Sequence, residues 1–213
     1  MTAEPTHLAI LLRESADVVT KDFHKRGVRP PLLVDTPGGV LVFGTDPFDL
    51  REVRWGLEMT SLRRARPLGM LWNRSAAGLV ISGRWQSYGW VWGSGTEASE
   101  LAALTPIGER DPADLIDWRE DGKSVRSVAR HTASVLGVRR SRLLVPSLRS
   151  PIIGGAAITL MLHAAGLNDT ASAFEMVQLA ISEAMPEQRH RWWQRSPETP
   201  AWFAADPLQP QVD

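Results

Sequence analysis

Apolar and polar segments in the first half of the chain alternate in the pattern of two β-hairpins. Apolar runs at 32–34 and 40–43 flank a turn that contains Pro37, Gly38 and Gly39, and such a turn between two apolar runs is typical of a hairpin. A second hairpin is indicated by the small polar loop 73–78 and by the apolar runs at 79–81 and 90–92, which are rich in β-branched and aromatic residues. The two hairpins predict an antiparallel sheet of about four strands.

Helical periodicity accounts for most of the remaining chain. In residues 6–26, apolar side chains recur at three- and four-residue spacing from Leu8 to Phe23, and Gly27 follows, which predicts a first helix. By the same criteria, further helices are predicted at 45–66, 97–104, 111–121, 124–136, 156–165 and 171–185. We therefore expect an α+β fold, with helices flanking the sheet on one face and a helical C-terminal lobe.

The chain length of 213 residues suits one domain with an appended lobe. We expect an α+β part at 1–121, a helical lobe packed on it at 122–195, and an irregular tail at 196–213. The first two parts are expected to form one compact unit.

Cysteine is absent from the chain. Its absence excludes disulfides, thiolate metal sites and cysteine nucleophiles, and is compatible with a cytoplasmic protein. The first residues lack the basic and apolar regions of a signal peptide. The most apolar run, 151–165, is shorter than the roughly 20 residues that cross a bilayer, so we expect no membrane partner.

Charge is distributed unevenly along the chain, although the formal net charge is zero. Residues 122–168 contain no aspartate or glutamate and carry a charge of +7, so the remainder carries −7. The seven cations are Lys123, Arg126, Arg130, Arg139, Arg140, Arg142 and Arg149. Guanidinium groups placed together suit phosphate oxygens or the carboxylates of a partner, which makes these residues candidate contacts for an anionic partner. Their pairing with the acidic segment 111–121 would instead make them an ordinary solvated face.

Part of this window resembles a degenerate helix-turn-helix at 124–145. An apolar helical stripe ends at Leu136, Gly137 follows as the turn, and Leu143 and Leu144 would lie in the second helix. That helix would enter the major groove of DNA, where arginine reads guanine edges. Pro146 leaves it very short.

Signals for catalysis or metal binding are weak throughout the sequence. The acidic residues at 111–121 suit a helix start, and no two histidines have metal-ligand spacing, so we predict no metal, no cofactor and no catalytic residue. An enzyme acting on a phosphorylated small molecule is an alternative, with Arg149 beside the Gly154–Gly155 loop as the anion site.

Nine tryptophans make the chain tryptophan-rich. Trp192 and Trp193, beside Arg191, are typical of an anchor in a contact with a protein partner or with a second copy of the chain. The sequence thus favours a non-enzymatic intracellular binding or regulatory module that uses residues 123–149 and exposed tryptophans to engage an anionic partner, either protein or nucleic acid. DNA binding and the phosphate enzyme are the alternatives.

Overall fold

The computed structural model describes residues 7–25, 32–43, 67–81, 87–93, 116–119 and 125–183. The chain divides into two compact units, Met1–Glu175 and Met176–Asp213. All described elements belong to the first unit, except the second half of the last helix, which belongs to the second.

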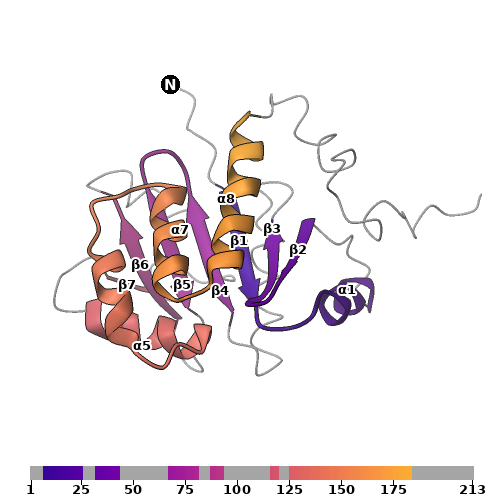
Figure 1. Ribbon diagram of the computed structural model, residues 1–213, viewed down its shortest axis with the longest axis horizontal. Helices are drawn as coiled ribbons and strands as arrows, with labels where there is room; N and C mark the ends of the chain where they lie inside the picture. Colours follow the sequence, from indigo (N-terminus) through magenta and orange to yellow (C-terminus); the bar gives the residue numbers. More distant parts are fainter. Residues whose placement is uncertain are drawn as a thin grey trace, which may run out of the picture. The chain divides into compact units, whose positions relative to one another are not determined.

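A seven-stranded sheet forms the centre of the first unit, with the strand order β2-β3-β1-β4-β5-β6-β7 (Figure 1). The strands are β1 (His7–Leu12), β2 (Leu32–Thr36), β3 (Gly39–Phe43), β4 (Leu68–Trp72), β5 (Ala77–Ile81), β6 (Ser87–Trp92) and β7 (Ile116–Arg119). All neighbours are antiparallel except β6 and β7, which are parallel. The α+β class and the first hairpin, β2–β3, are confirmed. The loop after Trp72 forms the turn of the second hairpin, β4–β5, whereas the predicted runs at 79–81 and 90–92 lie in β5 and in the next strand, β6. The sheet is wider than the four strands expected.

The prediction of one helix over 6–26 is wrong, because its first part is the strand β1. All of β1 except His7 is buried, since the strand lies in the interior of the sheet, paired with β3 on one side and β4 on the other. A strand covered on both faces has no polar alternation, so its short apolar run resembles a buried helix. The helix begins only after a polar break, where the carbonyl of Ser15 accepts from the amides of Val18 and Val19.

The predicted acidic helix at 111–121 is also corrected, because Ile116–Arg119 is the strand β7. Its four residues pair in parallel register with β6, from Ser87 opposite Ile116 to Trp90 opposite Arg119. Ile116 and Trp118 alternate with charged residues. This period-two pattern is typical of a strand, but it spans only four residues, so the acidic residues around it favoured the prediction of a helix.

The helices are α1 (Ala16–Lys25), α5 (Val125–Leu136), α6 (Val145–Leu148), α7 (Gly155–Ala164) and α8 (Asn168–Glu183), with a 3-10 turn η1 (Ser141–Leu144). The helices predicted at 124–136, 156–165 and 171–185 are confirmed, the last starting three residues earlier. Those predicted at 45–66 and 97–104 lie outside the described residues. Within the described part of the chain, no helix is long and apolar enough to cross a membrane.

Helices cover both faces of the sheet, and not one face as predicted. Val19 and Phe23 of α1 join a buried cluster with Ile10 and Val42. The neighbouring positions on these strands point to the opposite face, where Phe43 packs on Phe174 in the first half of α8. Figure 1 shows α5, α7 and the first half of α8 on this second side of the sheet.

The tryptophans of β4 and β6 belong to the core beneath these helices. Trp72, Trp90 and Trp92 are all at most 4% exposed. Trp72 meets Phe174 edge to face with ring centroids 4.8 Å apart, and Trp92 donates from Nε1 to the carbonyl of Ser147 at 3.0 Å. These three side chains therefore pack the core and offer no contact surface.

Candidate functional site

Helix α5 places two arginines on the surface because its apolar positions follow the helical period. Its inner face contains Val125, Val128, Ala129, Thr132, Ala133, Val135 and Leu136, all buried. Arg126 and Arg130 are one turn apart on the other side and are both exposed. The sheet thus fixes the orientation of the helix, and the helix directs both guanidinium groups toward solvent.

A glycine turn then brings three more arginines to the end of α5. Gly137 has a φ of +68°, and the amide of Val138 donates to the carbonyl of Ala133 at 2.8 Å, which is the hydrogen bond of a Schellman C-cap. Arg139, Arg140 and Arg142 follow, exposed, as the chain enters η1. Leu144 anchors η1 in the core.

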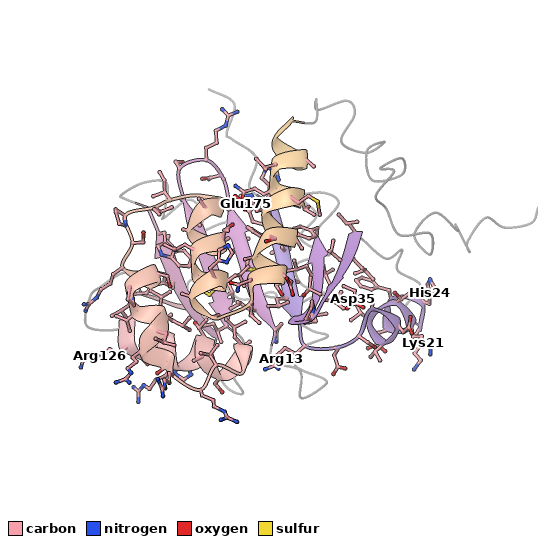
Figure 2. All side chains as sticks on the ribbon, in the orientation of Figure 1. Arg13, Lys21, His24, Asp35, Arg126 and Glu175 are labelled. Atoms are coloured by element: carbon pink, nitrogen blue, oxygen red, sulfur yellow. The ribbon has the colours of Figure 1, made fainter. Side chains whose placement is uncertain are left out.

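We refer to these five exposed side chains as the arginine surface: Arg126, Arg130, Arg139, Arg140 and Arg142. Among the described residues, none of them forms an ion pair. Figure 2 shows Arg126 and other nitrogen-tipped side chains projecting outward from the region of α5 and η1. No aspartate or glutamate lies within residues 122–168, and the side chains of the acidic segment 111–121 lie outside the described part of the chain.

The tertiary structure adds a sixth arginine that the sequence did not indicate. Arg13 is exposed in the turn between β1 and α1, and its guanidinium lies against Gly137. A Cβ atom on that glycine would be 3.0 Å from Cζ and 3.3 Å from Nη2 of Arg13. The C-terminus of a helix favours a cation, and the glycine leaves the space that this cation occupies. No local pattern signals the contact, because it joins residues far apart in the chain.

The other predicted site residues are not part of the arginine surface as described. Arg149 is exposed where α6 ends, and it interacts with another group, so it is not one of the unpaired cations. Lys123, Trp192 and Trp193 lie outside the described residues.

The helix-turn-helix candidate has α5 as its first helix and a broken second helix. η1 is a 3-10 turn of four residues, and α6 adds four more, with Pro146 in its first turn. Leu144, Ser147 and Leu148 are buried, whereas Leu143 is 52% exposed. A recognition helix reads bases with polar side chains on its outer face, and here that face holds a leucine and a proline beside Arg142.

Close packing explains the glycine before α7, which was the candidate phosphate loop. Gly154 has a φ of +64°, and a Cβ there would lie 2.9 Å from the carbonyl oxygen of Asn73 and 3.0 Å from that of Arg74. The partial negative charges of these two carbonyl oxygens oppose the attraction that a helix N-terminus otherwise has for an anion. The loop therefore has a packing reason for its glycine and an unfavourable environment for phosphate.

Metal chemistry has no candidate in the described part of the chain, where no group of three histidine, aspartate or glutamate side chains is placed to hold an ion. Comparison with known proteins finds no matching family model, no matching curated protein and no matching solved structure. Among the described residues, the arginine surface is the group of side chains best suited to binding another molecule.

Proposed function

We propose that this protein is a non-enzymatic binding or regulatory module that engages an anionic partner through the arginine surface. The observation that carries the proposal is the set of five exposed guanidinium groups with no ion pair among the described residues, in a stretch that contains no carboxylate. Guanidinium groups prefer bidentate bonds to phosphate or carboxylate. Guanidinium groups that form no ion pair with any described residue are therefore suited to an external anion.

Three of the tryptophans are excluded from contact with a partner. Since Trp72, Trp90 and Trp92 are buried, contact with a protein partner or a second copy of the chain would involve Trp192 and Trp193. A cytoplasmic setting suits a chain without cysteine, and it remains part of the proposal.

Two alternative functions, base-specific DNA binding and an enzyme acting on a phosphorylated small molecule, have no structural feature in their favour. DNA binding by base recognition is disfavoured by the interrupted second helix, with Pro146 within it. The phosphate enzyme is disfavoured by the carbonyl oxygens packed against Gly154.

The test is the triple variant R139A/R140A/R142A. We expect the wild type to bind a polyanion, either poly-L-glutamate or a DNA duplex, in 50 mM NaCl. The triple variant should lose at least about tenfold in affinity, because each lost cation contact lowers the binding constant at low salt. Fluorescence anisotropy with labelled polymers measures the change, and a thermal melt checks that the variant folds.

The matched control is R139K/R140K/R142K, which keeps all three charges and should retain most of the binding. If the alanine variant binds both polyanions as tightly as the wild type, the arginine surface is not the binding site. If the wild type binds neither polyanion, the proposed function is wrong.

A further inference from the structure

We infer that the anionic partner is the phosphate backbone of double-helical nucleic acid, and that Arg13 is a sixth contact in the surface that binds it. This inference rests on the proposed function and specifies its partner. It follows from the chemistry of the surface, from its length and from the packing of Arg13 on Gly137.

The chemistry of the surface suits a polyphosphate better than a protein. Protein interfaces have an apolar centre in which aromatic side chains carry much of the binding energy. Between Val125 and Leu148, the only large apolar side chain that is strongly exposed is Leu143, and this segment contains no aromatic residue other than His131. Six forked guanidinium groups and a single leucine match a regular array of phosphate oxygens.

The length of the surface favours a duplex over a single strand. Helix α5 has 12 residues, which span about 18 Å at 1.5 Å per residue. Arg126 lies near its start, and Arg13 lies at its end against Gly137. A major groove is about 12 Å wide, so Arg126 and Arg13 are far enough apart to contact phosphates on both sides of a groove. A site for a single strand would need aromatic side chains on which bases stack, and α5, η1 and α6 contain no Phe, Tyr or Trp.

Arg13 adds to the arginine surface because of two structural features. The polar break between β1 and α1 places it at the surface, and Gly137 lets its guanidinium lie close to the turn that ends α5. Arg139 and Arg140 follow that turn directly. The contact therefore extends the arginine surface from α5 and η1 to the turn between β1 and α1.

Recognition of this kind is independent of base sequence. The η1–α6 segment presents Leu143 and Pro146 where a recognition helix would present polar side chains. Contacts to phosphates position a protein on DNA but carry no sequence information, so we expect duplexes of unrelated sequence to bind equally well.

The experiment measures the anisotropy of a fluorescein-labelled 20-base-pair duplex between 20 and 300 mM NaCl, using the full chain. Six phosphate contacts predict a slope of log K against log [NaCl] of about −5, and the R13A variant should reduce its magnitude by about 1. At 0.1 M NaCl this corresponds to a roughly tenfold loss of affinity. R13K keeps the charge and should retain the wild-type slope.

Two further variants distinguish the loss of charge on the arginine surface from the loss of charge elsewhere on the protein. R126A/R130A changes two exposed helix positions to a good helix former, so it should fold, and it should reduce the slope by about 2. K21A removes one charge from an exposed position of α1, as R13A does from the turn before it, and should leave the slope unchanged.

The outcomes distinguish this inference from the proposed function. Binding to poly-L-glutamate without binding to the duplex would overturn the inference and leave the proposed function standing, whereas binding to neither would overturn both. Equal affinity for a single strand of the same length would refute duplex recognition. A folded R13A variant with the wild-type slope would remove Arg13 from the surface.

Discussion

At the scale of single residues, two buried threonines differ in whether their hydroxyl groups are hydrogen-bonded. Thr170 of α8 is 1% exposed, and its Oγ1 lies 2.8 Å from Oγ1 of Thr36, which itself donates to the carbonyl of Gly39. Thr132 of α5 is equally buried, but its Oγ1 has no hydrogen-bond partner among the residues that the structure describes. A buried hydroxyl without a partner lowers the stability of the native state, whereas a paired one does not.

Replacing each threonine by valine should therefore have opposite effects. T132V removes an unpaired buried hydroxyl with little change of shape, and we expect it to raise the free energy of unfolding by about 1 kcal/mol and the melting temperature by about 2–4 °C. T170V removes a bonded hydroxyl and should lower the free energy of unfolding by about 1 kcal/mol. Urea unfolding of both variants measures the difference. A loss of stability in T132V would mean that its hydroxyl is hydrogen-bonded in solution.

At the scale of elements, β1 joins the two hairpins into one sheet. It pairs with β3 of the first hairpin and β4 of the second. Ile10 lies opposite Val42 on one side and Gly69 on the other, and it is buried in the cluster that includes Val19 and Phe23 of α1. The backbone of β1 therefore forms hydrogen bonds with β3 and with β4, and its side chains pack in the core.

A proline in β1 should break this connection. I10P removes a backbone donor in the interior of the sheet, and we expect a loss of about 3 kcal/mol or more in the free energy of unfolding. The matched variant A16P places proline at the first position of α1, where the amide has no helical partner, and should be tolerated. Far-ultraviolet circular dichroism in urea compares the two. Equal stability of both variants would contradict the interior position of β1.

At the scale of the whole molecule, the chain is neutral but its charge is segregated. Residues 122–168 carry +7 and the remainder −7, and the sequence pI is about 7.0. A molecule without net charge lacks the mutual repulsion that keeps proteins apart, and its opposite charges can attract those of other copies.

Solubility should therefore be lowest near pH 7 in low salt, and it should rise when salt screens the attraction between copies. R139A/R140A/R142A removes three positive charges from a neutral molecule, so the variant carries a net negative charge and should be more soluble at pH 7. R139K/R140K/R142K keeps the charge and should behave as the wild type. Precipitation by polyethylene glycol at pH 7 measures the solubility of all three proteins, and identical curves for the wild type and the alanine variant would contradict the electrostatic origin of the effect.

The sequence alone determined the elements whose signals are local. The turn at Pro37 and Gly38, the loop after Trp72 and the helical period of α5 each specify a structure within about ten residues, because turn chemistry and amphipathic periodicity act over that range. The concentration of arginine in 122–168 is likewise a property of the sequence.

Only the tertiary structure decided the features that depend on distant partners. An apolar run such as Leu8–Leu12 becomes a strand when two other strands supply its hydrogen bonds, and a tryptophan such as Trp92 becomes a core residue when a helix carbonyl accepts from it. The contact of Arg13 with Gly137 has the same origin. Pairing, burial and the grouping of charges are non-local properties, because each arises from the free energy of segments that meet only in the folded chain.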